Sequence, residues 1–150
     1  MVTSEKVLDP ADVVLAQDKC LTADGVDYAR WLETVFIPLS LISEGKSFHI
    51  ESDEAFVGHL KALEEKAFEL GVVALETQIL SHVRPSVDMA ILSSIRRRLG
   101  ANDEVIGESS ITWTVIRVGE GWRVNQIFFN DSVYDPSIVG QVFLGRSNKK

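Results

Sequence analysis

The sequence predicts an α+β fold in which a strongly curved, mostly antiparallel sheet wraps around three N-terminal helices. Three observations lead to this prediction. Helical periodicity is confined to the first half of the chain, four strand-like segments follow one another between residues 72 and 130, and the predicted helices present apolar faces that need a cover. Helices collected on one face of a single sheet would bury these faces together.

Two helices are expected near the N-terminus. Asp9-Pro10 begins the first, because aspartate caps free backbone amides and proline suits the first helical position, and this helix runs to about Lys19. A second helix is predicted from Val26 to Phe36, where apolar residues follow the i, i+3, i+4 spacing of one helix face. Pro38 is expected to end it.

A short hairpin and the longest helix come next. The turn Glu44-Gly45-Lys46 predicts a hairpin between residues 39–43 and 47–51. Ser52 or Asp53 can cap a third helix that ends at Gly71. One apolar stripe of this helix predicts its buried face: Phe56, Leu60, Leu63, Ala67 and Leu70.

Four strands follow as a meander, predicted at residues 74–83, 89–98, 105–118 and 122–130. Alternating apolar and polar residues in the first strand indicate that one face is buried. Gly119-Glu120-Gly121 predicts a tight hairpin before the last strand. We expect a single domain over residues 1–150, with its core between residues 10 and 130 and flexible segments at 1–8 and 145–150.

Composition argues against several classes of partner and site. A net charge of −7 and a pI of about 4.9 disfavour nucleic acids and anionic membranes, which bind concentrated basic surfaces. The single Cys20 provides neither an intrachain disulfide nor a thiolate metal cluster, and no histidine spacing indicates another metal site. We therefore expect no metal and no cofactor. The N-terminus lacks the pattern of a secretory signal, so a cytoplasmic protein is expected.

The order of these elements is accompanied by three short motifs: Asp27-Tyr28-Ala29-Arg30-Trp31-Leu32, Glu51-Ser52-Asp53-Glu54 and Gly121-Trp122-Arg123-Val124. With them, residues 10–130 resemble the nuclear transport factor 2-like superfamily, and the SnoaL-like (polyketide cyclase-like) branch is the most similar. This resemblance implies a cone-shaped sheet with an apolar pocket at its open end. Members of the superfamily include isomerases, dehydratases, hydrolases, cyclases and non-catalytic binding domains, so the fold alone does not fix the function.

The resemblance also directs attention to titratable residues. Ketosteroid isomerase-like members carry an aspartate on the first strand after the second helix, but residues 38–43 contain no acid. His82, on the first long strand, remains the candidate general base, with an exposed or hydrogen-bonded strand histidine as the alternative. His49 and His59 are expected at the surface.

Arg96 is the candidate for anion binding. Residues 88–96 look like the strand that, in calcium/calmodulin-dependent kinase association domains, directs an arginine into the pocket. An inward Arg96 could bind a carboxylate through two parallel hydrogen bonds; the alternative is an arginine on the outer face or at an edge of the sheet. Trp113 and Phe129 occupy positions where those domains have further arginines, which favours an apolar ligand.

Strand alternation places Asn125, Ile127 and Phe129 on one face of the last strand, and Trp122, Val124, Gln126 and Phe128 on the other. The resemblance favours the first set as pocket lining, and Trp31 could contribute a wall from the helices. The predicted ligand-binding residues are therefore Trp31, Arg96, Trp113, Asn125 and Phe129.

Three functional hypotheses follow. The first is a small-molecule-binding protein without catalytic machinery, which takes an apolar or carboxylate ligand. The second is a cofactor-independent lyase, isomerase or hydrolase with His82 as general base. The third is a non-catalytic interaction module. We expect a homodimer, because the second face of the sheet carries aliphatic and aromatic side chains in its last two strands, and residues 138–144 could add to that interface.

Overall fold

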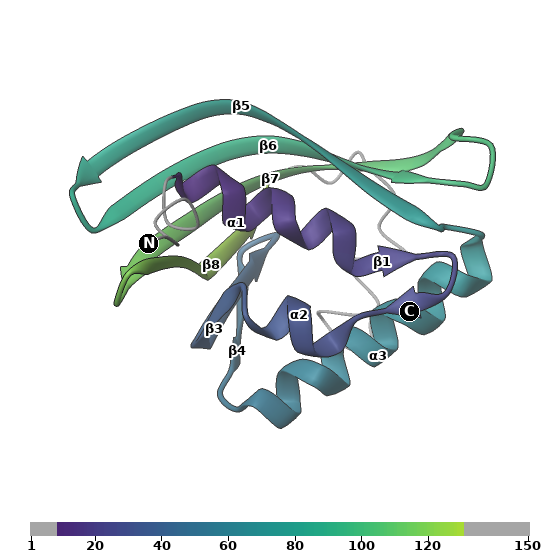
Figure 1. The fold of residues 1–150 in the computed structure, drawn as a ribbon, viewed down its shortest axis with the longest axis horizontal. Helices are drawn as coiled ribbons and strands as arrows, with labels where there is room; N and C mark the ends of the chain where they lie inside the picture. The colour runs from purple at the N-terminus through teal and green to yellow at the C-terminus, as the bar shows by residue number, and fades with distance from the viewer. Residues whose placement is uncertain (1–8, 131–150) are drawn as a thin grey trace, which may run out of the picture.

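The computed structural model describes residues 9–130. Six strands form one curved sheet with helices on its concave side (Figure 1). In spatial order the strands are β4 (Lys46–Ile50), β3 (Val35–Ser43), β8 (Gly121–Phe129), β7 (Val105–Val118), β6 (Met89–Leu99) and β5 (Ala74–Ser86). Between neighbouring strands of this sheet, β3 and β8 run parallel and the other pairs are antiparallel. The predicted curved, mostly antiparallel sheet is confirmed.

The first helices begin where the sequence supplies a capping aspartate. In α1 (Pro10–Gln17), Asp9 Oδ1 accepts a hydrogen bond from the Ala11 amide at 2.9 Å, and a 3₁₀ turn, η2 (Asp18–Cys20), continues the helix. In α2 (Tyr28–Leu32), Asp27 Oδ1 accepts from the Arg30 amide at 3.1 Å. Each carboxylate satisfies a backbone donor that the first turn of a helix leaves free.

The second helix is shorter than predicted. The two-residue strands β1 (Leu21–Thr22) and β2 (Gly25–Val26) precede it, and Val35 and Phe36 belong to β3 rather than to a helical stripe. Val35 pairs with Val124 in the parallel ladder, and the Val124 amide donates to Thr34 O at 2.8 Å. Tertiary pairing thus overrides the helical spacing that these apolar residues also satisfy.

The longest helix, α3 (Asp53–Leu70), has the predicted ends. Ser52 Oγ accepts from the Ala55 amide at 3.0 Å, and Gly71 follows the helix with a φ of 80°. Three members of the predicted stripe are buried and two are partly buried against the core: Phe56, Leu60 and Ala67, then Leu63 and Leu70.

Glu64 connects the exposed side of α3 to the segment before α2. Its Oε2 accepts from the Val26 amide at 2.8 Å, and its Oε1 accepts a short hydrogen bond from the Tyr28 hydroxyl. The approach is close: a Cβ on Gly25, whose φ is 119°, would lie 2.5 Å from Glu64 Oε2. These contacts hold β2 and α2 against α3.

The last strand contains a β-bulge at Asn125. Thr114 pairs with Gln126 while the next residue of β7, Val115, pairs with Val124, so Asn125 faces no partner across the ladder. An extra residue shifts the alternation of side chains by one. The parity predicted for this strand holds for Ile127 and Phe129, which line the cavity, but fails before the bulge, where Val124 is buried in the core in place of Asn125.

Two of the predicted features fall outside the described part of the chain. The expected flexible segments, 1–8 and 145–150, and the apolar segment 138–144 all lie beyond residues 9–130. Within the described residues, no helix combines the length and the apolar character needed to cross a membrane.

Candidate functional site

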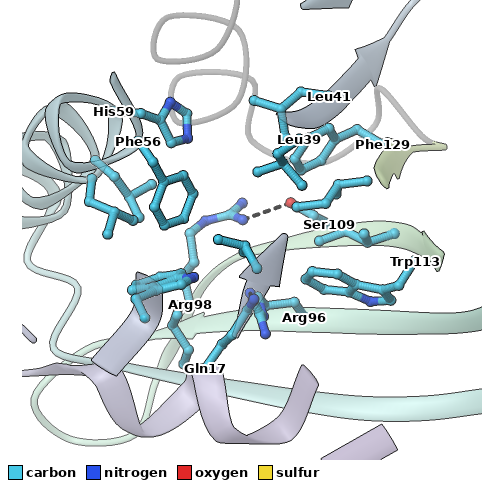
Figure 2. A pocket seen from close by; sticks show the side chains of 17 residues that line it. Gln17, Leu39, Leu41, Phe56, His59, Arg96, Arg98, Ser109, Trp113 and Phe129 are labelled. Atoms are coloured by element: carbon cyan, nitrogen blue, oxygen red, sulfur yellow. Dashed lines mark hydrogen bonds between the residues drawn. The ribbon is translucent and has the colours of Figure 1, made fainter. Parts of the chain in front are cut away.

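A cavity of about 80 Å³ lies between the helices and the concave face of the sheet (Figure 2). Twelve of its seventeen lining residues are apolar, and they include Trp31 and Phe56 from the helices and Leu39 from β3. The remaining five are polar: Gln17, His59, Arg96, Arg98 and Ser109. Within the described lining there is no aspartate or glutamate. The site is thus an apolar chamber with a few cationic and neutral polar groups on its wall.

The alternation of β6 supplies two of the polar lining residues, Arg96 and Arg98. Its inward residues, Ser94, Arg96 and Arg98, are all buried, because side chains two residues apart project to the same face of a strand. Arg97 lies between the two inward arginines on the opposite face, where its guanidinium is within 4 Å of Glu76 and Glu108. The same alternation that points Arg96 inward also points Arg98 inward, a signal that was available in the sequence.

Arg98 lies among the lining side chains, only 4% exposed (Figure 2). Its Nη1 donates to Ser109 Oγ at 2.8 Å. Its guanidinium also lies over Gly107 of β7, since a Cβ on that glycine would be 2.4 Å from Nη2. The absence of a side chain at residue 107 thus provides the space that the guanidinium occupies.

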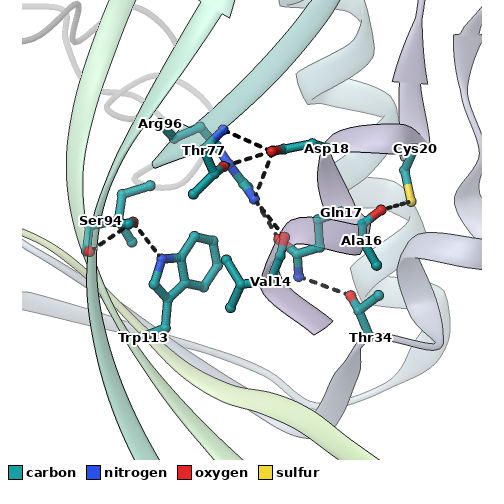
Figure 3. Close-up of polar contacts among 11 residues, drawn as sticks. Val14, Ala16, Gln17, Asp18, Cys20, Thr34, Thr77, Ser94, Arg96 and Trp113 are labelled. Carbon is teal, nitrogen blue, oxygen red and sulfur yellow. Dashed lines mark hydrogen bonds and ion pairs between the residues drawn. The ribbon is translucent and has the colours of Figure 1, made fainter. Parts of the chain in front are cut away.

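Arg96 is tied to the end of α1 (Figure 3). Its Nε donates to Thr77 Oγ1 at 2.8 Å, and its two terminal nitrogens donate to Gln17 Oε1 at 3.1 Å and to the carbonyl oxygen of Val14 at 3.2 Å. Its Nη2 also lies 3.3 Å from Asp18 Oδ1. These contacts use most of the donors of one guanidinium. Although Arg96 lines the cavity, its charge is matched by a carboxylate outside the cavity lining.

The predicted aromatic residues Trp31, Trp113 and Phe129 also line the cavity. Trp113 is 1% exposed, and its indole nitrogen donates to Ser94 Oγ at 2.8 Å. The Arg96 guanidinium carbon lies 4.7 Å from the centre of the Trp113 ring, a cation–π geometry. The tryptophan is therefore held by both a hydrogen bond and a stacked cation.

His59 lines the cavity from α3, contrary to the surface position expected for it. The residue follows Phe56 by three positions, so its half-buried side chain lies beside the apolar stripe. Its ring stacks with Phe56 at a centroid distance of 6.2 Å. Burial lowers the pKa of His59 to about 3, which keeps the imidazole neutral at physiological pH.

Two predicted site residues lie elsewhere. His82 is exposed, on the part of β5 beyond the cavity. This exposed position is the alternative that the sequence leaves open for the residue. Asn125 occupies the bulge and does not line the cavity. The extra residue in β8 changes the alternation of side chains that the prediction for Asn125 assumes.

His49 and Trp122 do not line the cavity. His49 is exposed, as expected, with its Nδ1 3.1 Å from Ser40 Oγ. Trp122 packs against two guanidinium groups, those of Arg84 at 4.9 Å and Arg117 at 5.2 Å from its ring centre. Within residues 9–130, no group of three or more histidine, cysteine, aspartate and glutamate side chains is arranged to hold a metal ion.

Known structures share this fold. An NTF-2-like protein of unknown function from Shewanella oneidensis MR-1 is 16% identical and superposes with a TM-score of 0.64, over 81% of this chain and 95% of the other. A protein of unknown function with a cystatin-like fold from Nostoc punctiforme PCC 73102 is 14% identical, with a TM-score of 0.62 over 85% and 90%. A ketosteroid isomerase-like protein from Erwinia carotovora atroseptica SCRI1043 is 12% identical, with a TM-score of 0.58 over 84% and 95%.

The family comparison covers most of the chain. A search among curated proteins found no match. The model of the family described as NTF2-like protein (DUF6841) matches residues 16–131, which contain α2, α3 and the whole six-stranded sheet. The SnoaL-like branch is not distinguished by these relatives and stays a prediction. The curved sheet and this match lead to one conclusion: the chain belongs to the NTF2-like family DUF6841.

Proposed function

We propose that this protein binds a small, largely apolar molecule in the cavity beneath the sheet. The observation that carries the proposal is the composition of the cavity wall, on which a few polar groups converge in an otherwise apolar chamber. Such a combination is typical of ligand sites, because apolar walls supply affinity and the polar groups fix orientation. An interaction module whose cone is filled by its own side chains fits less well with a chamber of about 80 Å³.

Binding is favoured over acid–base catalysis by the chemistry of the wall. The described lining contains no carboxylate, and the exposed His82 is outside it. His59 lines the cavity, but its pKa of about 3 makes its imidazole a weak proton acceptor. The relative described as ketosteroid isomerase-like therefore supports a similar fold here rather than a similar reaction.

We further propose a SnoaL-like member of the family that acts as a homodimer in the cytoplasm. The sequence motifs support the SnoaL-like branch. The aliphatic and aromatic side chains on the convex face of the sheet support the homodimer. The single buried cysteine is compatible with the cytoplasm, which is a reducing compartment.

A cavity-filling variant tests the binding function. In Ile127→Phe, the larger ring should occupy part of the chamber, at a stability cost of about 1–3 kcal/mol. The exposed Leu80 provides the matched control, Leu80→Phe. We expect a small apolar probe such as xenon to shift the amide NMR signals of cavity residues in the wild type and in the control, but not in Ile127→Phe. Equal binding by all three proteins, or no binding by any, would contradict the proposal.

A further inference from the structure

We propose that the cavity takes a small neutral carbonyl compound, whose oxygen accepts a hydrogen bond from the Ser109 hydroxyl. This inference rests on the proposed function and adds the chemical class of its ligand. It follows from the direction of the hydrogen bonds around the cavity, because the described wall has donor hydrogens without acceptors and offers few acceptors of its own.

The direction of the Ser109 hydroxyl is set by its partner. Ser109 is 2% exposed and lines the cavity from β7 (Figure 2). Its Oγ lies 2.8 Å from Arg98 Nη1, and because a guanidinium has hydrogens but no acceptor, the serine must accept in this bond. Its own proton therefore needs another acceptor, and the described residues provide none. A buried donor in this state is costly unless another molecule accepts from it.

Gln17, at the end of α1, has a second such hydrogen (Figure 3). Its Oε1 accepts from Arg96 Nη1 at 3.1 Å, and its Nε2 donates to Thr34 Oγ1 at 2.9 Å. The guanidinium, which can only donate, fixes this orientation of the amide, and the Thr34 hydroxyl donates onward to the Trp31 carbonyl at 2.6 Å. The other hydrogen of Nε2 has no acceptor among the described residues, although Gln17 is buried.

Acceptors are scarce on the same wall. The described lining contains no aspartate or glutamate, the two lining arginines only donate, and the Gln17 oxygen already accepts from Arg96. The neutral imidazole of His59 has one donor and one acceptor nitrogen, so it does not change the balance. A ligand such as an amide would bury its own donors with few partners, whereas a ketone oxygen only accepts.

An anionic ligand is disfavoured by the surroundings of the two lining arginines. The Arg96 guanidinium lies 3.3 Å from Asp18, so its charge is matched. Arg98 has an interaction besides its bond to Ser109, so its charge is not assigned to a ligand. An anion without a counter-charge is expensive to bury among apolar side chains. The carboxylate ligand expected with Arg96 is accordingly replaced in this proposal by a neutral one.

The volume limits the ligand. The chamber of about 80 Å³ is roughly half of the ~150 Å³ apolar cavity that binds benzene in an engineered protein. A ligand that enters without rearrangement thus has only a few non-hydrogen atoms. Acetone, which has one carbonyl group between two methyl groups, combines this size with the apolar surface that the wall contacts.

The experiment uses four probes of nearly the same planar shape. Acetone only accepts hydrogen bonds, acetamide also donates them, acetate carries a charge, and isobutene has no polar group. Dissociation constants are measured by NMR titration with the full chain. We expect the wild type to bind acetone more tightly than acetamide and acetate by roughly tenfold or more, because both would bury polar atoms without partners.

Ser109→Ala tests the assigned hydrogen bond. It should weaken acetone binding by about three- to tenfold and change isobutene binding by less than about twofold, because the alkene makes no bond to the hydroxyl. Ser110→Ala is the matched control, since Ser110 is the next residue of β7 and lies outside the described cavity lining. Both affinities should stay at the wild-type values in this control.

A milder variant keeps the test valid if circular dichroism shows that Ser109→Ala does not fold. Ser109→Cys has nearly the same size, but its thiol is a weaker donor than a hydroxyl. It should therefore weaken the binding of acetone relative to that of isobutene, as Ser109→Ala does.

The outcomes separate the two proposals. If acetone or isobutene binds in the cavity while the folded Ser109 variant leaves the ratio of their affinities unchanged, only this inference is overturned. The same holds if acetamide or acetate binds more tightly than acetone, or if Ser110→Ala has the effect expected of Ser109→Ala. If no probe binds in the cavity, the proposed function fails together with this inference.

Discussion

The carboxylate of Asp18 lies 3.3 Å from the guanidinium of Arg96 and joins the end of α1 to the sheet. The same carboxylate accepts hydrogen bonds from the Thr77 amide at 2.8 Å and from the Thr77 hydroxyl at 2.7 Å. Thr77 Oγ1 in turn accepts from Arg96 Nε at 2.8 Å. Three side chains from η2, β5 and β6 thus form one closed network beside the cavity.

Loss of the Asp18 charge should destabilise the protein strongly. In Asp18→Asn the buried Arg96 guanidinium would lose its counter-charge, and breaking a buried pair from one side costs about 3–5 kcal/mol. Urea unfolding measures this cost. Glu69→Gln is the control, because it removes an exposed ion pair with Lys66 and should cost less than about 1 kcal/mol. Similar losses in the two variants would argue against the network.

Two glycines at α3 should respond in opposite ways to alanine. Gly58 lies within the helix, and the space that an added methyl group would occupy is open, so Gly58→Ala should stabilise the protein by about 0.5–1 kcal/mol. Gly71 has a φ of 80°, which an L-residue adopts at a cost, so Gly71→Ala should destabilise it by about 1–2 kcal/mol. Thermal unfolding of both variants decides this; effects of the same sign would contradict the assigned end of the helix.

Glu64 should make stability depend on acidic pH. Its hydrogen bonds from Tyr28 and from the Val26 amide lower the pKa of its carboxyl below the ordinary 4.5. A carboxyl with a lowered pKa contributes stability that is complete above 4.5 and is lost as the pH falls through the folded-state pKa. Glu64→Gln should therefore lose stability at neutral pH and show a smaller decrease on acidification. Glu65→Gln, on the exposed side of α3, is the matched control.

His59 should make the unfolding free energy depend on pH in a higher pH range than Glu64 does. Burial lowers its pKa from the ordinary 6.5 to about 3, so the unfolded chain takes up a proton that the folded protein does not. Stability should accordingly fall as the pH decreases from 6.5 toward 3. In His59→Asn the part of this loss between about pH 7 and pH 5 should disappear, and that range lies above the Glu64 effect. Unfolding free energies with the same pH slope in both proteins would refute the assignment.

The convex face of the sheet should mediate dimerisation. Ile91 and Ile95 of β6 and Phe128 of β8 project from it and are only half-buried. We expect light scattering to give a mass about twice 16.6 kDa. Ile95→Asp should yield the monomer, since a charge on an apolar interface is costly, whereas Lys61→Glu on the exposed side of α3 should not. A monomeric wild type at micromolar concentration would exclude this interface.

Local chemistry makes some of these elements predictable from the sequence. The ends of α3 follow from the Ser52 cap and from Gly71, and the strands of the meander follow from alternation and turn residues. The inward position of Arg96 is one of the two alternatives that the sequence leaves open, and the structure adopts it. In these cases the determining interaction lies within a few residues of the position concerned.

The predictions from the sequence are wrong where contacts between residues distant in the sequence determine the local structure. Strict alternation misplaces Asn125 because this residue is an extra one in its β-ladder, and such a bulge depends on the partner strand. Helical spacing puts Val35 in a helix because its pairing partner, Val124, is remote in the sequence. Arg98 and His59 are absent from the predicted site although strand alternation and the helical spacing from Phe56 point to them.

The Asp18–Thr77–Arg96 network also bears on how the chain folds. Its contacts from Asp18 reach Thr77, 59 positions away, and Arg96, 78 positions away, and long-range contacts of this kind form slowly because a large loop must close first. During synthesis α1 leaves the ribosome early, but its sheet contacts require the chain to be complete beyond residue 96. The cavity is therefore assembled only when the N-terminal helix is recruited by a hairpin made much later.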